Sequence, residues 1–112
     1  PKDDPTRQEV MEKCLRDAAA VPLEILDLCC EAIDLHREFA DKGSALAVSD
    51  AATGVVFCWG AMYGAAVNVK VNTKAMTDRD YAAKLNDHVD ARMEKYWPIA
   101  EKVYEDVYRR FC

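Results

Sequence analysis

A long apolar run, Val48 to Val71, occupies the middle of the chain and constrains its fold more than any other feature. The run is rich in alanine and glycine, has one acidic residue near its start, and ends among asparagines and lysines. A helix that is apolar on all sides is typical of a buried core element or of a membrane span. Asp50 and the many small residues lower the hydropathy of the run, so the sequence favours a buried core helix over a membrane span.

Three glycines, Gly54, Gly60 and Gly64, lie within this predicted helix. A glycine inside a helix costs about 1 kcal/mol relative to alanine, so three of them need a compensating contact. Small residues allow another backbone to approach closely. The expected compensation is therefore a tightly packed neighbour, supplied by the other helices of the chain or by a partner.

Apolar residues at helical spacing predict two helices before the central run. The first covers residues 6–20 behind a capping box, Thr6-x-x-Glu9. The chain is expected to restart at Val21-Pro22, because proline is favoured in the first turn of a helix. This second helix reaches residue 41, and Gly43 then supplies the stop.

The central helix is predicted from its N-cap candidates Ser49 and Asp50 to about Val69. The valines around residue 69 alternate with polar residues and by period alone could form a short strand, but helix is preferred. A last helix opens at residue 77 and carries an apolar stripe to residue 111. The stripe stays in phase past Pro98, which is expected to kink the helix without ending it.

Four predicted helices without a convincing strand indicate an all-α, multi-helical bundle, a single domain over residues 1–112. The Gly/Ala-rich helix is expected at its centre. Three neighbouring helices would not cover an apolar helix on every side, so the bundle is expected to be oligomeric.

Charge and cysteine content narrow the classes of partner and compartment. A net charge of -5 and the lack of a basic stripe argue against nucleic acid and against an anionic membrane surface. Five cysteines, an odd number, indicate reduced thiols in a cytoplasmic protein. No C-x-x-C pair accompanies His36 and His88, so no metal site is expected, and both histidines are expected on solvated helix faces.

Polar residues stand at both ends of the apolar run. Asp50 opens it, and Asn68, Lys70 and Asn72 close it. One interpretation is that they only cap the helix, because caps are common uses of these residue types. The other is that they face a ligand. Periodicity leaves both interpretations open.

The chain carries four segments in a fixed order: PKDDPTRQE, AAAVPLEILDLCCEAI, GSALAVSDAATGVVFCWGAMYGAAVNVKVN and MTDRDY. Their order and spacing resemble the C-terminal half of the formiminotetrahydrofolate cyclodeaminase and methenyltetrahydrofolate cyclohydrolase family, over nearly the whole chain. Members of that family usually carry, upstream, a Gly-rich segment of the Thr-x-Gly-Gly-Gly-Ser kind and a further acidic residue assigned to cyclodeaminase catalysis. This chain contains neither.

The resemblance implies an enzyme of one-carbon metabolism, or part of one, that hydrolyses 5,10-methenyltetrahydrofolate to 10-formyltetrahydrofolate. The alternatives are a formiminotetrahydrofolate cyclodeaminase and a non-catalytic helical subunit that assembles with a partner chain. The tetrahydrofolate derivative would be the substrate, with no metal. The implied partners are further copies of the chain, as a dimer or larger homo-oligomer, or a chain carrying the missing N-terminal half, with no nucleic acid and no membrane.

The resemblance also carries site residues over to this chain. Ser49, Asn68 and Asn72 match polar positions of the family and are implied to line the folate site. Asp50 is the candidate catalytic residue, orienting water or accepting its proton, although a supporting role at the helix end is preferred. Lys70 is a candidate for the glutamate tail of the folate, or is simply solvent-exposed.

Overall fold

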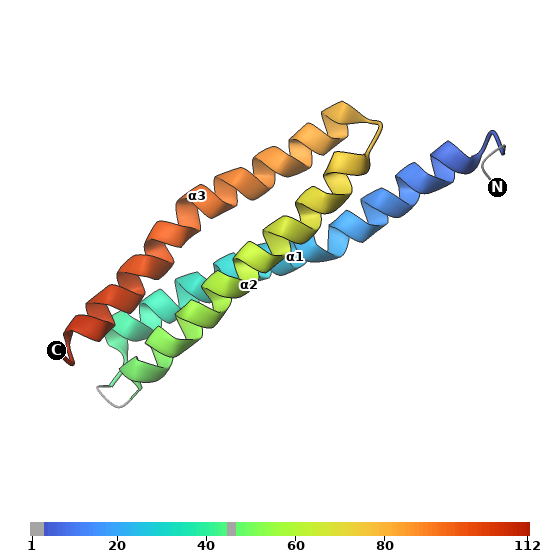
Figure 1. Cartoon of the computed structure of the whole chain (residues 1–112). Helices are drawn as coiled ribbons and strands as arrows, with labels where there is room; N and C mark the ends of the chain where they lie inside the picture. The colour runs from blue at the N-terminus through green and yellow to red at the C-terminus, as the bar shows by residue number, and fades with distance from the viewer. Residues whose placement is uncertain (1–3, 45–46) are drawn as a thin grey trace.

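The structure, a computed structural model, describes residues 4–44 and 47–112, and these residues form three long α-helices and no strand. The helices are α1 (Arg7–Lys42), α2 (Val48–Ala75) and α3 (Arg79–Arg109). They make an elongated bundle of 63 × 20 × 19 Å, in which α2 runs antiparallel to both α1 and α3 (Figure 1). The predicted all-α class is confirmed, while Pro1–Asp3 of the quoted lead-in lie outside the described residues.

The number of helices differs from the prediction because α1 continues through Pro22. A proline inside a helix removes one backbone hydrogen bond, the one that the carbonyl of Ala18 would accept. Both halves of α1 pack against the rest of the bundle, and α1 and α2 share the most extensive contact of the three pairs. This packing offsets the lost hydrogen bond. Pro98 likewise lies inside α3, which continues to Arg109, so the prediction that Pro98 does not end the helix is confirmed.

The predicted helix starts are partly wrong. Thr6 is the N-cap of α1, but its amide and hydroxyl donate to Asp4 Oδ1, at 2.8 and 2.7 Å, so no capping box forms. Ala47 precedes α2, which places Ser49 and Asp50 inside its first turn instead of at the cap. Asp78 caps α3 by accepting from the amide of Tyr81 at 3.0 Å.

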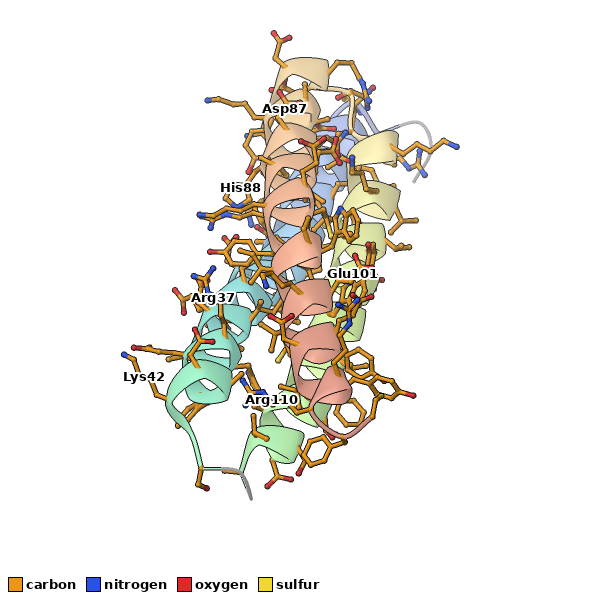
Figure 2. All side chains as sticks on the ribbon, turned by 90° about the vertical axis from the view of Figure 1, so that its left-hand side faces the viewer. Arg37, Lys42, Asp87, His88, Glu101 and Arg110 are labelled. Carbon is orange, nitrogen blue, oxygen red and sulfur yellow. The ribbon has the colours of Figure 1, made fainter. Side chains whose placement is uncertain are left out.

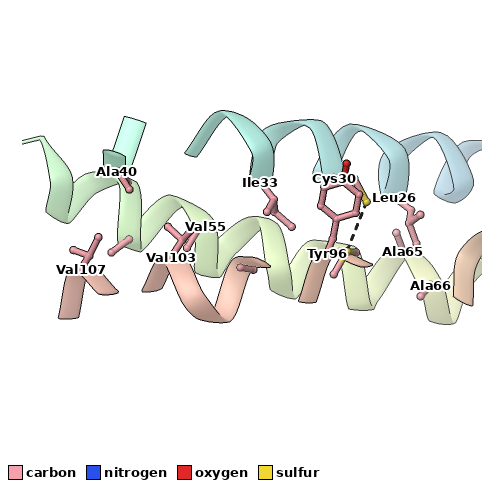
Figure 3. Close-up of a cluster of buried hydrophobic side chains, with 14 of the residues drawn as sticks. Leu26, Cys30, Ile33, Ala40, Val55, Ala65, Ala66, Tyr96, Val103 and Val107 are labelled. Atoms are coloured by element: carbon pink, nitrogen blue, oxygen red, sulfur yellow. Dashed lines mark hydrogen bonds between the residues drawn. The ribbon is translucent and has the colours of Figure 1, made fainter. Parts of the chain in front are cut away.

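The core runs along the seam where the three helices meet. In Figure 3 the buried side chains of α1 and α3 converge on α2, and the thiol of Cys30 contacts Met62 Sδ at 3.8 Å. Small residues on α2 let its neighbours approach closely. The largest fully buried side chains include Leu26, Ile33, Met62, Val55, Val69 and Val89.

The turn between α2 and α3 is braced by the N-terminal half of α1. The carboxylate of Glu12 accepts hydrogen bonds from the amides of Thr77 and Asp78 at 2.8 and 3.0 Å. Arg16 pairs with Asp78 at 2.9 Å and lies 4.0 Å from the centre of the Tyr81 ring. These contacts fix the end of α2 relative to α1, and with it the residues discussed next.

The central helix is buried on one side only. Its inner face contacts α1 and α3, while Phe57 and Val67 on its outer face are 74% and 68% exposed. A single chain therefore does not achieve the burial on every side that the apolar run predicts. The expected oligomer stays a prediction.

In the described residues α2 is also the one helix long and apolar enough to cross a membrane, with a mean hydropathy of 1.3 in its most apolar window. Core helices of bundles meet the same criterion. Lys70 in α2 pairs with Asp90 of α3 at 2.7 Å, and the flanking helices are rich in charged residues. These contacts favour the interpretation of α2 as a core helix.

Candidate functional site

A groove of about 430 Å³ lies between the middle of α1 and the second half of α2. Its α1 wall includes Val21, Pro22 and Ile25, and two side-chain amides, Asn68 and Asn72, lie on its α2 side. A larger hollow of about 540 Å³ lies near Glu12, but that carboxylate is already used in bracing the α2–α3 turn. The groove is the better candidate site because it combines apolar walls with polar groups.

Both amides of the groove are held by their own helix. Asn68 Nδ2 donates to the carbonyl of Gly64, and Asn72 Nδ2 donates to the carbonyl of Asn68, each at 2.8 Å. A side-chain amide has two donor hydrogens and an acceptor oxygen. Each asparagine thus keeps one N–H and its Oδ1 for a ligand, in an orientation fixed by the first bond.

The α1 wall was not singled out from the sequence. Pro22 was interpreted as a helix start, whereas it lies inside α1 and leaves the carbonyl of Ala18 without its usual helical donor. Ala18 also lines the groove. The signal that could have indicated this wall is a proline in the middle of a helical pattern, shortly after the three alanines at positions 18–20.

Lys70 does not line the groove. Its ammonium group pairs with Asp90 Oδ1 of α3 at 2.7 Å, and its side chain is 40% exposed. The structure therefore separates Lys70 from Asn68 and Asn72, which turn toward α1.

Ser49 and Asp50 lie at the opposite end of α2. Both are exposed, and the carbonyl of Ser49 accepts a hydrogen bond from the hydroxyl of Thr53 at 3.1 Å. At about 1.5 Å of rise per residue, Asp50 is about 27 Å from Asn68 along the helix axis. Within one chain, Asp50 and the two asparagines are too far apart to contact the reacting bond of the same small molecule.

None of the described residues that line the groove carries a titratable side chain. The groove can hold a ligand through apolar contact and amide hydrogen bonds. A proton acceptor for hydrolysis would have to come from outside it, from a second copy of this chain or from another polypeptide.

A second set of polar side chains joins α1 to α3. The ring of His88 donates from Nε2 to Asp27 at 2.8 Å, and Tyr96 donates its hydroxyl to Asp34 at 2.8 Å. Arg37 also pairs with Asp34, and His88 and Arg37 lie along the same side of the bundle (Figure 2). These groups satisfy one another, so they fasten the two helices together and leave no evident ligand position.

The two histidines are less solvated than predicted. His88 is half-buried in its pairing with Asp27. His36 is half-buried against α2, and its Nδ1 donates to the carbonyl of Ala32 at 2.6 Å. His88 therefore links α3 to α1, whereas His36 bonds within α1 and its ring packs against Gly54 of α2. In the described part of the chain, no three His, Cys, Asp or Glu side chains are grouped to hold a metal ion.

The cysteines that face the core are shielded. Burial raises the pKa of Cys30 to about 11, and it also raises the pKa values of Cys29 and Cys58. Because the thiolate is the nucleophile, these thiols are poor candidates for covalent catalysis. All five cysteines are free thiols in the structure.

The fold and the groove define a small all-α domain with a ligand-sized groove beside its Gly/Ala-rich helix. A sequence profile of the formiminotransferase-cyclodeaminase family matches residues 1–91. The chain belongs to this family. It is also similar to the methenyltetrahydrofolate cyclohydrolase of Methylorubrum extorquens, with 32% identity over 101 residues, or 90% of this chain and 49% of that relative. The chain spans about half the length of this curated relative.

Proposed function

We propose that this chain forms part of a cytoplasmic, folate-dependent enzyme that hydrolyses 5,10-methenyltetrahydrofolate to 10-formyltetrahydrofolate. Family membership and the printed name of the similar relative support folate one-carbon chemistry of this kind. The observation that carries the proposal is the groove, where Asn68 and Asn72 present free amide groups beside an apolar wall.

The chemistry of the groove suits a reduced folate. A pterin is flat and has donors and acceptors around its rim, which fit the remaining N–H and Oδ1 groups of Asn68 and Asn72. Val21, Pro22 and Ile25 offer apolar surface to its ring faces. Neither lysine near the end of α2 lines the groove: Lys70 pairs with Asp90, and Lys74, two positions beyond Asn72, lies on another face of the helix.

The reaction needs a base. Water adds its oxygen to the bridging carbon of the methenyl cation, the bond from that carbon to N5 breaks, N5 keeps one hydrogen, and one proton is released. A carboxylate that orients the water and accepts this proton contributes typically 10²–10⁴-fold, about 3–5 kcal/mol. Asp50 is our candidate for this carboxylate. It lies outside the groove of its own chain, next to Ser49 in the sequence.

Two alternatives have their own support. Cyclodeamination runs related chemistry from the formimino side and would use the same groove with an acid for the leaving ammonia. A non-catalytic helical subunit is favoured by the lack of a titratable group among the groove's described lining residues. In that case the chain would bind folate, or a partner that binds it, without turnover.

The test is an assay of 5,10-methenyltetrahydrofolate hydrolysis by the purified chain, in which the reaction is monitored through the loss of the substrate's ultraviolet absorbance. We expect turnover above the buffer rate, and a loss of at least about 100-fold for Asp50→Asn. Asp87→Asn, which changes an exposed carboxylate of α3, is the matched control and should keep the wild-type rate. No turnover by the wild-type chain would reject hydrolysis by this chain alone, and equal rates for both variants would reject Asp50.

A further inference from the structure

One side of α3 carries a row of acidic and aromatic side chains that continues into the turn after the helix. Its members follow one another at alternating steps of four and three residues, the spacing at which side chains share one side of a helix: Asp90, Glu94, Trp97, Glu101, Tyr104, Tyr108 and Phe111. Glu101 is half-buried, and the other members are exposed. We call these residues the acidic–aromatic stripe.

The stripe lies on the flank of α3 that borders α2. Its first member, Asp90, accepts a hydrogen bond from the ammonium group of Lys70 of α2 at 2.7 Å. Figure 2 shows Glu101 on the opposite side of α3 from His88, which bonds to Asp27 of α1. The stripe is therefore separate both from the groove between α1 and α2 and from the polar contacts that join α1 to α3.

The aromatic members of the stripe present their rings to solvent. Trp97, Tyr104 and Tyr108 are 39%, 38% and 58% exposed. The rings of Tyr104 and Tyr108 stack on each other, with their centres 5.8 Å apart. Tyr63 of α2, also exposed, adds a ring two helical turns from the Lys70–Asp90 pair. Aromatic side chains gathered on a surface are typical of protein contacts, where rigid rings bury a large area at a low cost in conformational entropy.

Two carboxylates of the stripe are available to a partner. Glu94 and Glu101 lie on either side of Trp97 along the stripe, and neither has an ion pair among the residues that the structure describes. A cation that meets these carboxylates would also lie close to the indole of Trp97, whose face attracts positive charge. This arrangement selects a partner that presents lysine or arginine.

The shape of the stripe selects a helix as the partner. The stripe is straight and about 30 Å long, so a helix laid along it could set basic residues against Glu94 and Glu101 and apolar residues against the tyrosines. A second copy of this chain is a poor match, because a two-fold contact centred on the stripe would bring Glu101 of one copy against Glu101 of the other. The carboxylates also disfavour an anionic membrane surface.

We propose that the acidic–aromatic stripe docks a basic amphipathic helix of another polypeptide alongside α3. The stripe shares no residue with the groove, so a partner bound here leaves the groove open. The proposal goes beyond the proposed hydrolysis and does not depend on it.

Intrinsic fluorescence tests the proposal, because both tryptophans of the chain are near the stripe. Trp97 is a member, and the ring of Trp59 lies 6.3 Å from that of Tyr63. The probe is a synthetic amphipathic helix of leucine and lysine, about four turns long, and its control has glutamate in place of every lysine. We expect a saturable change with the lysine peptide that weakens as salt is added, and none with the glutamate peptide. No saturable change, or equal changes with both peptides, would overturn the proposal.

Charge variants locate the bound peptide. The double variant Glu94→Gln/Glu101→Gln should bind the lysine peptide at least about fivefold more weakly than the wild type, because two charge pairs are lost. The double variant Glu24→Gln/Glu31→Gln is the matched control: it changes two exposed carboxylates of α1 at the same spacing and should bind as the wild type does. Circular dichroism verifies that both are folded. Equal affinities of the two double variants would contradict docking on the stripe.

An aromatic variant gives an independent measurement by isothermal titration calorimetry with the lysine peptide. Tyr108→Ala should weaken binding at least about fivefold, whereas Phe39→Ala, which removes a similarly exposed ring of α1, should leave it unchanged. Equal affinities would overturn the proposal. So would binding of the wild type to phosphatidylcholine vesicles in place of the peptide, which assigns the stripe to a membrane. Altered sedimentation of Tyr108→Ala without peptide would assign the stripe to a second copy and would also overturn it.

Discussion

Gly54 of α2 packs against the imidazole ring of His36 of α1, so closely that a Cβ at position 54 would lie 2.6 Å from Cδ2 of the ring. The hydrogen bond from His36 Nδ1 to the carbonyl of Ala32 holds the ring in place. The two helices meet here without room for a methyl group.

The two glycine environments of α2 predict stability changes of opposite sign. Gly54→Ala should lower the free energy of unfolding by about 1–3 kcal/mol, because the methyl group overpacks a fixed ring. Gly60→Ala should raise it by up to about 1 kcal/mol, because alanine favours helix and the position is open. Urea unfolding at a protein concentration too low for self-association measures both. Changes of the same sign would contradict the described packing.

Tyr96→Phe should lower the free energy of unfolding by about 1 kcal/mol, because it removes the hydroxyl that donates to Asp34. Asp34 keeps Arg37 as a partner, so the loss stays modest. Tyr108→Phe changes an exposed tyrosine of α3 and serves as the control. Thermal unfolding of the two variants should differ, and identical curves would argue against the Tyr96–Asp34 bond.

The same hydrogen bond predicts an alkaline transition. Bonding to Asp34 raises the pKa of Tyr96 above its usual value of 10.0. A raised pKa means that the folded state holds its proton more tightly than the unfolded state. The stabilisation is therefore complete below about pH 10 and is lost as the pH rises through the pKa of the folded state. Unfolding measured from pH 8 upward should show this extra loss in the wild type and not in Tyr96→Phe.

Cys30 should resist thiol reagents until the protein unfolds. Its side chain is buried, and burial raises its pKa to about 11, so the thiolate is scarce at neutral pH. Cys14 is exposed in α1 and supplies the internal comparison. Mass spectrometry after brief alkylation at pH 7.5 should find Cys14 modified and Cys30 intact, and equal labelling of the two would contradict the packing of α1 on α2.

Glu12→Gln should loosen the α2–α3 turn. Hydrogen bonds from the amides of Thr77 and Asp78 lower the pKa of Glu12, so the carboxylate braces the turn at neutral pH and releases it as the pH falls. Amide hydrogen exchange at Thr77 and Asp78 should be faster in the variant than in the wild type. Glu9→Gln, one turn earlier in α1, should leave both amides protected.

The apolar residues of α2 continue around the helix and predicted burial on every side, whereas one side is exposed. The sequence predicted the helical class correctly because that follows from the spacing of apolar residues. It did not predict that α1 continues through Pro22, because the loss of one hydrogen bond is offset by long-range packing that local patterns do not record. The capping box at Thr6 failed because Asp4, two residues earlier, accepts the hydrogen bonds of the Thr6 amide and hydroxyl. The last helix begins after Asp78, whose carboxylate accepts from the amide of Tyr81.

The structure brings two of the predicted site residues together and leaves the others apart, while the roles of all of them stay predictions. Asn68 and Asn72 do share a groove, since a spacing of four residues places them on one face of α2. Lys70, two positions from each, necessarily turns to another face and meets Asp90. Ser49 and Asp50 belong to the far end of the same helix, and only a second chain could bring them near the groove. A list of polar positions carries no information on that assembly.

The most direct test of the account is the binding of 5,10-methenyltetrahydrofolate to the purified chain, measured by isothermal titration calorimetry for the wild type, Asn72→Ala and Gln8→Ala. Asn72 lies in the groove, and Gln8 offers a matched amide beside the larger hollow near Glu12. We expect saturable binding by the wild type. Asn72→Ala should weaken this binding about three- to tenfold, because one or two hydrogen bonds to the ligand are lost, and Gln8→Ala should leave it unchanged. No binding by the wild type, or equal affinities for all three proteins, would contradict a folate site in this groove.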